Sequence, residues 1–312
     1  MEISILLAEQ ILAMFLTMAV GFGVVRAGLF KTEDSRIISN MVVYICNPCV
    51  VVHSFQIELT DDKIKGLMIA IGLSVVVHMV LIIGSEILSF IFHFNSIEKA
   101  SIIYTNAGYL VIPLVGAVLG EEWVFYTTAF ILVQTVLMWT HGVKLIGQEK
   151  ELNIRKILCN PNVIAMIIGI ALFALEIRLP TVVDSCVSGF GDMISPASMM
   201  VIGMVIGDVD LKWVFRQKRP YLICLLRLIV FPLIAVVAFA GLERSGLHPD
   251  AEYILMIVLI ATSAPAAAMI TQLAQIYGKD SRYASVINVM SVIFCIITMP
   301  VMVLSYEMLI AL

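Results

Sequence analysis

The sequence has little charge for its length. Only 13% of its 312 residues are charged and 61% are hydrophobic, whereas about a quarter of the residues of a soluble domain are charged. So few charges cannot cover a water-facing surface of this size. The apolar residues also gather in runs that approach the roughly 20 residues needed to cross a bilayer as a helix. These features exclude a soluble protein and predict an integral membrane protein.

Several chemistry-bearing motifs are also missing. The sequence contains no HExxH, no GxxxxGK[ST] and no GxGxxG, the motifs of zinc proteases, phosphate loops and dinucleotide sites. The net charge of −4, with no basic cluster beyond short loops, gives no sign of nucleic-acid binding. We therefore expect no enzymatic activity, no metal, no cofactor and no nucleic-acid partner.

The six cysteines do not predict a disulfide framework. Most lie inside apolar runs, where Cys behaves as a small hydrophobic residue. Cys46 and Cys49 form a CxxC, but no second ligand pair accompanies them, so a zinc or redox motif is not indicated.

Charged and turn-rich gaps divide the chain into ten apolar segments. They are 4–25, 37–57, 66–92, 97–119, 123–146, 160–177, 185–208, 219–241, 251–276 and 283–310. The longest polar stretch follows the fifth segment and divides the chain nearly in half. We predict an all-α integral membrane protein with ten transmembrane helices in two five-helix repeats. The first repeat is 1–147, a cytoplasmic linker is 148–159, and the second repeat is 160–312.

Basic residues alternate between the two sets of loops. Fourteen of the 19 Lys and Arg residues fall in one set, and only Lys63, Lys65, Arg178 and Arg244 fall in the other. Because cytoplasmic loops retain positive charge, the first set is predicted to be cytoplasmic. This places the chain in the inner (plasma) membrane as a multi-pass protein with both termini outside.

Two short matches relate the halves of the chain. ICNP at 45–48 corresponds to MISP at 193–196, and TNAG at 105–108 corresponds to TSAP at 262–265. They occur in the second and fourth segments of each half. An odd number of helices per half forces the second copy to be inverted, which is the design of many alternating-access carriers.

The matched segments contain helix breakers. Proline lacks an N–H and clashes with the preceding turn, so Pro113 and Pro265 should leave helices four and nine locally unwound. Freed backbone groups are tolerated in a membrane only where protein or a water-filled cavity satisfies them. The half-helix N-termini would then offer N–H donors to an anion. We predict a substrate site formed by Asn47, Asn106, Gly108, Pro113, Ser195, Ser263, Pro265 and Gln272.

Two charged residues inside the segments are candidate charge partners at that site. Arg227 is close enough to the inner end of its segment for its side chain to reach the cytoplasm; alternatively, it binds an anionic substrate or pairs with Glu86. Asp192 lies just before Ser195 and Pro196, deeper than a loop carboxylate, and is a candidate carrier of a proton or a cation. Close helix packing is predicted at Gly116/Gly120 and Gly203/Gly207, which have GxxxG spacing.

Asp192 also raises an alternative class of protein. Residues 189–192 read GxGD, as in intramembrane aspartyl proteases, which need a second aspartate because one carboxylate acts as base and the other as acid. The expected Tyr-Asp partner does not occur in the sequence. A channel is a further alternative, but no filter-like repeated loop is present.

The sequence resembles a known family at the two breaks. NAGYLVIP at 106–113 resembles the fourth-helix motif of the auxin efflux carrier family, with Val111 where that family usually has glycine. Ala264-Pro265, followed by YGKD at 277–280 and Ala284-Ser285, is similar to its ninth-helix signature. The resemblance spans essentially the whole chain. It implies crossing helices four and nine, a pocket beside the crossover and elevator-like movement.

The resemblance also implies a function. We expect a secondary transporter of small organic anions, such as dicarboxylates or auxin-like acids, in contact with the lipid bilayer. Coupling to H⁺ or Na⁺, the direction of transport and a homodimer are left open by the sequence.

Overall fold

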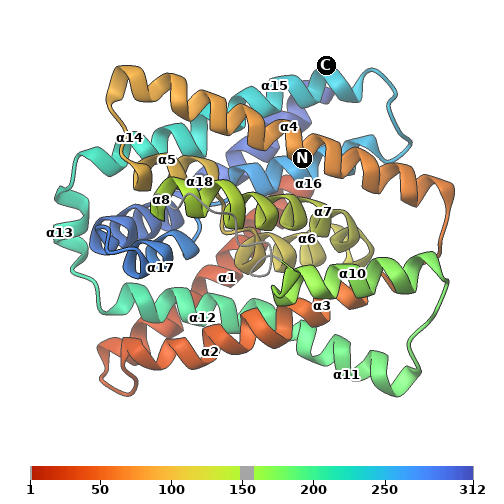
Figure 1. Ribbon diagram of the computed structural model, residues 1–312, viewed down its shortest axis with the longest axis horizontal. Coiled ribbons are helices and arrows are strands. Elements are labelled where there is room, and N and C mark those ends of the chain that lie inside the picture. Colours follow the sequence, from red (N-terminus) through yellow and green to blue (C-terminus); the bar gives the residue numbers. More distant parts are fainter. Residues whose placement is uncertain (1, 148–157, 312) are drawn as a thin grey trace.

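The computed structural model describes residues 2–147 and 158–311, and this part of the chain is helical apart from turns and one isolated β-bridge (Figure 1). Seven helical stretches are long and apolar enough to cross a membrane: Glu9–Arg26, Thr32–Ser54, Asp61–Phe92, Glu121–Gly147, Thr181–Gly207, Arg219–Glu243 and Ser281–Ile310. Three shorter apolar helices are Ala107–Leu119, Pro161–Ala174 and Ala251–Ser263. Each of the ten predicted segments overlaps one of these stretches. The protein is thus an all-helical membrane protein, and ten crossings stay a prediction.

Several stretches are built from more than one helical element. The elements of the first half are α1 (Glu2–Arg26), η1 (Thr32–Asp34), α2 (Ser35–Met41), η2 (Val42–Cys46), α3 (Asn47–Ser54), α4 (Asp61–Phe92), α5 (Ser96–Ile103), η3 (Ala107–Val111), α6 (Ile112–Leu119), α7 (Glu121–Leu137), η4 (Met138–Gly142) and α8 (Val143–Gly147). The elements of the second half are α10 (Pro161–Ala174), α11 (Thr181–Asp192), α12 (Ile194–Gly207), α13 (Leu211–Arg216), α14 (Arg219–Leu225), η5 (Leu226–Val230), α15 (Phe231–Glu243), α16 (Ala251–Ser263), α17 (Met269–Ile276) and α18 (Ser281–Ile310).

Polar side chains fix where several helices begin. The Thr60 hydroxyl accepts a hydrogen bond from the Lys63 amide at the start of α4. Asn95 and Glu98 form a reciprocal capping box at the start of α5. Such caps stabilise a helix by about 1 kcal/mol each, because they satisfy amides that have no partner within the helix. The short turns between apolar stretches are therefore well defined.

Three of the prolines that lie inside continuous helices come just after a π-helical turn. Pro48 follows η2, Pro113 follows η3 and Pro232 follows η5. A proline removes one hydrogen bond and crowds the carbonyl four residues earlier, and the wider π-turn gives this carbonyl a different position. The helix continues through each proline as a result.

The predicted unwinding at Pro113 is therefore wrong. Helix four is interrupted earlier, at residues 104–106, where Tyr104 is extended and Asn106 has φ −85° and ψ 48°. In helix nine the break extends from Ala264 to Ala268, between α16 and α17, and it does contain Pro265. Proline marks only one of the two breaks because a π-turn accommodates the other proline.

The helices fall into two groups. We call α1, α2, α3, α10, α11 and α12 the panel, and α4 to α8 with α14 to α18 the core group. Within the panel, α1 packs along α12, and α3 packs against α10 and α11. Within the core group, α4 packs on α7 and α16, and α18 packs on α15, α16 and α17. The panel elements α2, α3, α11 and α12 run together along the lower edge of Figure 1.

Glycines let α1 and α12 approach closely. A side chain at Gly203 would overlap the Met18 backbone, and one at Gly21 would overlap the Met200 carbonyl. Gly207 likewise lies against Val25. The GxxxG spacing of Gly203 and Gly207 therefore holds two helices of the same chain together.

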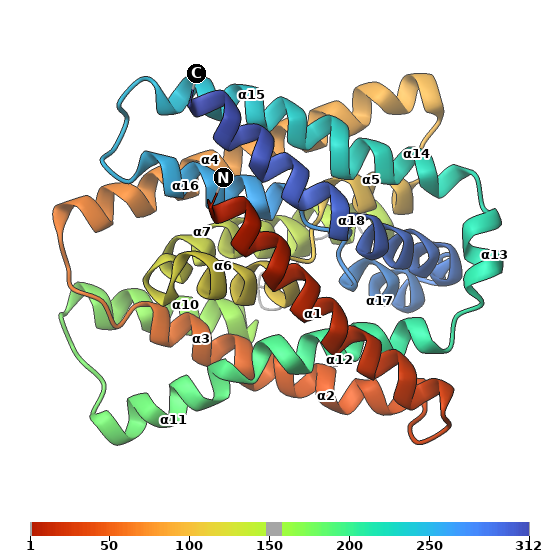
Figure 2. The same cartoon turned by 180° about the vertical axis from the view of Figure 1, so that it is seen from behind.

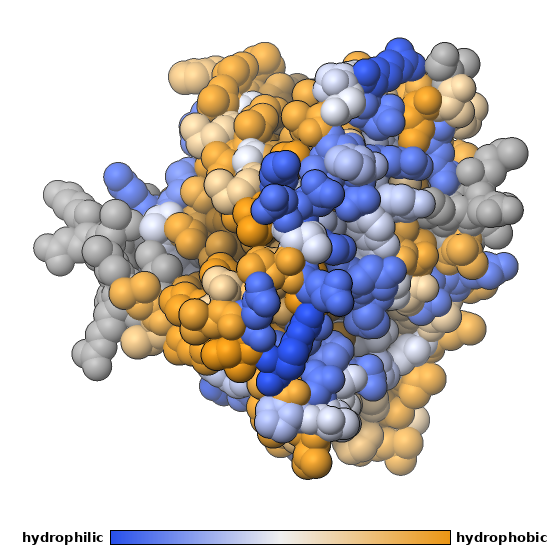
Figure 3. Space-filling view, turned by 90° about the vertical axis from the view of Figure 1, so that its right-hand side faces the viewer, coloured by the Kyte–Doolittle hydropathy of each residue, from blue (hydrophilic) through white to orange (hydrophobic). Residues whose placement is uncertain are grey.

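The two ends of the molecule carry different turns. In Figure 2 the turns holding Arg178 and Arg244 lie at one end, and the turns holding Lys31, Lys218 and Lys279 lie at the opposite end. Figure 3 faces the first of these ends and shows a band of hydrophilic side chains with hydrophobic ones on its flanks. This is the surface expected where one end of a helix bundle meets water between lipid-facing sides.

Candidate functional site

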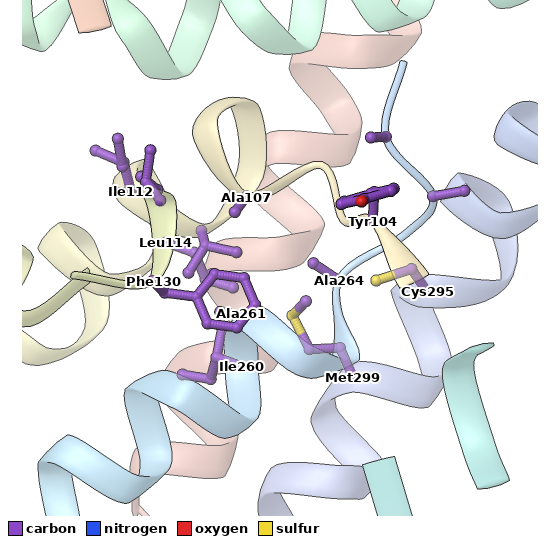
Figure 4. Close-up of a cluster of buried hydrophobic side chains, with 14 of the residues drawn as sticks. Tyr104, Ala107, Ile112, Leu114, Phe130, Ile260, Ala261, Ala264, Cys295 and Met299 are labelled. Carbon is purple, nitrogen blue, oxygen red and sulfur yellow. The ribbon is translucent and has the colours of Figure 1, made fainter. Parts of the chain in front are cut away.

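The two helix breaks meet and pair. Thr105 and Ala266 form an antiparallel β-bridge. The Asn106 amide donates to the Pro265 carbonyl at 2.8 Å, and the Ala267 amide donates to the Tyr104 carbonyl at 3.0 Å. Tyr104 and Ala264, one from each break, lie close together beside Cys295 and Met299 (Figure 4). The crossover of segments four and nine is thus a short piece of β-structure inside a helical protein.

A glutamine on α7 satisfies the first break. The Gln134 carbonyl oxygen accepts from the amide and the hydroxyl of Thr105, at 2.8 and 2.9 Å. The Gln134 Nε2 donates to the Thr105 carbonyl at 2.9 Å. All these groups are buried, where an unpaired backbone group costs about 1–3 kcal/mol. Gln134 therefore replaces the helical hydrogen bonds that Thr105 has lost.

Two side chains on α18 do the same for the second break. Asn288 Nδ2 donates to the Ala266 carbonyl at 2.6 Å, and the Ser291 hydroxyl accepts from the Ala266 amide at 3.1 Å. In both halves the bridge residue is held by the last long helix of that half. Sequence analysis missed Gln134, Asn288 and Ser291. Their signal was an amide or hydroxyl near the middle of an otherwise apolar segment.

Arg227 lies at the crossover and does not reach the cytoplasm. Its side chain is 0% exposed. Nε donates to the Ala264 carbonyl at 3.1 Å and Nη1 donates to the Ile102 carbonyl at 3.0 Å. Glu86, its alternative predicted partner, instead bonds Lys99 at 2.7 Å. Both predictions for Arg227, snorkelling and a Glu86 pair, are therefore wrong, because the freed carbonyls at the breaks bind the guanidinium.

Asn47 and Gly108 bring segment two to the crossover. A side chain at Gly108 would lie 3.3 Å from Asn47 Nδ2, so the glycine makes room for this amide. Asn47 is buried and its Oδ1 atom has no partner within the described residues. The Ser263 hydroxyl, next to the second break, is also buried without a partner there. These unpaired polar atoms beside the breaks are candidate ligand-binding groups.

A cavity of about 230 Å³ lies between the panel and the core group. It contains three of the predicted site residues, Pro113, Asp192 and Ser195. The panel contributes residues of α1, α3, α11 and α12, and the core group contributes residues of α6 and α7. The lining residues are Gln10, Val50, His53, Ser54, Ile112, Pro113, Ala117, Glu121, Val124, Ser188, Gly191, Asp192, Ile194 and Ser195.

The cavity lining is acidic. Asp192 and Glu121 are its carboxylates, and no Lys or Arg is among the lining residues. Its histidine, His53, bonds Asp184 at 2.9 Å. Asp192 is the one aspartate among the lining residues. The protease alternative needs a second aspartate, and the described lining of this cavity does not include one.

The predicted site residues thus fall into three places. Asn47, Asn106, Gly108, Ser263 and Pro265 lie at the crossover. Pro113, Ser195 and Asp192 line the cavity. Gln272 lies exposed on α17 and does not join either group. Within the described residues no group of three or more His, Cys, Asp or Glu could hold a metal ion.

Apolar helices of membrane length, two broken helices that pair centrally, and a cavity between two helix groups define a multi-pass membrane transporter. A family model described as Membrane transport protein matches the chain twice, over residues 6–154 and 149–303. The chain belongs to this family, the auxin efflux carrier family. No curated protein matches the chain. Membership makes the protein a secondary membrane transporter.

Proposed function

We propose that the protein carries small organic anions, such as dicarboxylates or auxin-like acids, by elevator-type alternating access. The observation that carries this proposal is the pairing of the two breaks through Thr105 and Ala266. In the proposed topology ten helices form two inverted repeats with both termini outside the plasma membrane. The turns 27–31, 217–218 and 277–280 lie at the opposite end from the turns 175–180 and 244–250 (Figure 2), and the larger number of basic residues at the first end supports this orientation.

An anion is favoured at the crossover by the amino-terminal ends of two helices. The 107–119 and 269–276 helices begin there, and the Leu110, Ile270 and Thr271 amides already bond carbonyls of the breaks. The positive ends of both helix dipoles also lie there. The carbonyl ends of α5 and α16, which would favour a cation, are already bound by Arg227. Asn47 beside Gly108 adds an amide donor at the same level.

Movement of the core group against the panel is supported by the position of the cavity. Its lining comes from both groups, so relative sliding would change its shape and access. Inside the panel, the glycine-mediated contact between α1 and α12 supports movement of these helices as one unit. A hydrogen bond of 2.9 Å between Ser39 on α2 and Tyr109 on η3 crosses from panel to core group. Such a bond can exchange for water during sliding at a small net cost, of the order of 1 kcal/mol.

The carboxylates that line the cavity concern the coupling of anion transport to a second ion. Asp192 and Glu121 would repel an anion that entered alone, so we propose that Asp192 carries a proton or a cation with the substrate. A carboxylate that lines the cavity can bind such an ion. The bound ion then offsets the negative charge that would repel the anion.

The central experiment is uptake of labelled dicarboxylates and indole acids into proteoliposomes. Asn106→Ala and Pro265→Ala should abolish uptake while the protein remains folded, because both residues belong to the paired breaks. Gln275→Ala, at an exposed position on α17, is the control and should transport normally. Full uptake by both crossover variants would exclude this site.

The same vesicles separate carrier from channel. A carrier shows saturation and exchange of external label for internal substrate, whereas a channel shows neither. Incubation with a membrane peptide tests the protease alternative. Cleavage that is lost in Asp192→Asn would contradict transport as the function.

A further inference from the structure

Arg227 makes an unusual set of contacts for a buried arginine. It lies in the π-turn η5 and bonds the Ile102 carbonyl in the last turn of α5 and the Ala264 carbonyl at the end of α16. These are the two helices that stop at the breaks. One side chain therefore links the carboxyl ends of both half-helices.

The charge of Arg227 is not balanced by a carboxylate. Among residues 2–147 and 158–311 it forms no ion pair, although it is fully buried. A helix C-terminus carries about half a negative elementary charge, so two such ends together offset about one positive charge. The ends of α5 and α16 provide this amount at the guanidinium. This explains how an unpaired cation is stable in the interior of a membrane protein, where it is otherwise very costly.

We propose that Arg227 is a positioning residue that acts as a built-in cation at the crossover. Its guanidinium neutralises the ends of α5 and α16 and keeps the two breaks in register, so that Thr105 can pair with Ala266. The carbonyls of Ile102 and Ala264 are thereby occupied and cannot coordinate a metal cation such as sodium. The proposal deepens the proposed function, because it rests on the crossover being the transport site.

The shape of the side chain fits this role. Arginine presents donors in a planar fork and can reach carbonyls of two different helices at once, whereas the lysine ammonium is a compact point charge on a flexible stem. Arg227 uses two of its nitrogens on two helices, and Nη2 has no partner within the described residues.

Chemical rescue tests the proposal without any substrate. We expect Arg227→Ala to lower the thermal unfolding midpoint of the purified protein by about 5–10 °C. Millimolar guanidinium should restore about half of this loss, because the free ion can occupy the vacated space between the two helix ends. The matched control is Arg244→Ala, since Arg244 also donates to a helix-terminal carbonyl, that of Leu309, but is exposed. Its midpoint should change little and should not rise with guanidinium.

Several results would overturn the proposal. Equal responses of the two alanine variants to guanidinium would do so, as would a specific rise of the Asp192→Asn midpoint in sodium compared with choline at equal ionic strength, because this variant lacks the cavity carboxylate that is proposed to bind a cation. If Arg227→Ala yields folded protein only when purified with guanidinium, the proposal is supported. If it yields none under either condition, the proposal is contradicted.

Arg227→Lys provides a second variant that keeps the charge. It should fold with a smaller loss of stability than Arg227→Ala, and its maximal uptake rate should fall severalfold while half-saturation stays near the wild-type value. An unchanged uptake rate would contradict the positioning role. If the wild type moves no anion but the guanidinium rescue holds, the proposed function fails and the role of Arg227 at the crossover stands.

Discussion

At the scale of single residues, the crossover depends on side chains that replace lost backbone hydrogen bonds. Gln134 forms hydrogen bonds with the backbone of Thr105 in the first half. Asn288 and Ser291 do so with the backbone of Ala266 in the second half. Backbone groups freed in a membrane cannot turn to water, so each break needs such partners. These polar side chains are the reason that two helices can stop in the interior.

We predict that Gln134→Leu destabilises the protein by about 3 kcal/mol or more, because it keeps the side-chain volume but leaves three buried groups of Thr105 unpaired. Thermal unfolding in detergent measures the change. Gln275→Leu, at an exposed position on α17, should leave the midpoint almost unchanged. Similar losses in the two variants would mean that the hydrogen bonds to Thr105 contribute little.

Asp192 gives a prediction about the charge of the substrate. Removing a negative charge from the cavity in Asp192→Asn should strengthen binding of an anion by about 1 kcal/mol, roughly fivefold in half-saturation. Substrate exchange between equal concentrations measures this without requiring an ion gradient. A weaker half-saturation in the variant would instead indicate a cationic substrate.

At the scale of helices, glycine and proline decide how closely segments pack and where they bend. Gly21 and Gly203 allow backbone contact between α1 and α12. Pro48, Pro113 and Pro232 each follow a π-turn, so those helices change their winding without stopping. The panel can therefore be stiff while the core group contains the breaks.

Helix packing can be tested with two glycines of adjacent helices. Gly203→Ala places a methyl group against the Met18 backbone and should cost about 1–3 kcal/mol of stability. Gly189→Ala on α11 meets no atom within 4 Å and should be neutral or stabilise the helix by up to about 1 kcal/mol. Equal unfolding midpoints for the two variants would contradict backbone contact between α1 and α12.

At the scale of the whole molecule, the distribution of basic residues underlies the proposed orientation in the membrane. The turns that hold Lys218 and Ser245 lie at opposite ends in Figure 2. From the positive-inside rule we propose that the Lys218 end faces the cytoplasm. The cavity between panel and core group would then open and close by sliding along the axis that joins these ends.

Labelling with an impermeant maleimide in intact cells tests this orientation. The exposed Cys159 and Cys186 are first replaced by Ser, and the resulting protein gives the background. Ser245→Cys should be labelled in intact cells, whereas Lys218→Cys should be labelled only after permeabilisation. The reverse pattern would invert the proposed topology.

The sequence by itself determined the membrane class, the positions of the apolar segments and the family. These follow from local properties: hydropathy runs, loop charges and the NAGYLVIP motif at 106–113. It also indicated Asn106 and Pro265, which lie at the two helix breaks, because turn-forming residues in an apolar run can be recognised without knowledge of tertiary contacts.

Only the tertiary structure decided which residues hold the crossover. Proline chemistry alone predicts a break at Pro113, but the π-turn before it removes the clash, and the break moves to 104–106. Arg227 could have reached the cytoplasm by length alone; the freed carbonyls of Ile102 and Ala264 hold it in the interior. Gln134 and Asn288 acquire their roles only because distant helices bring them to the breaks. Hydropathy is a property of each segment, whereas the satisfaction of buried polar groups depends on which segments meet.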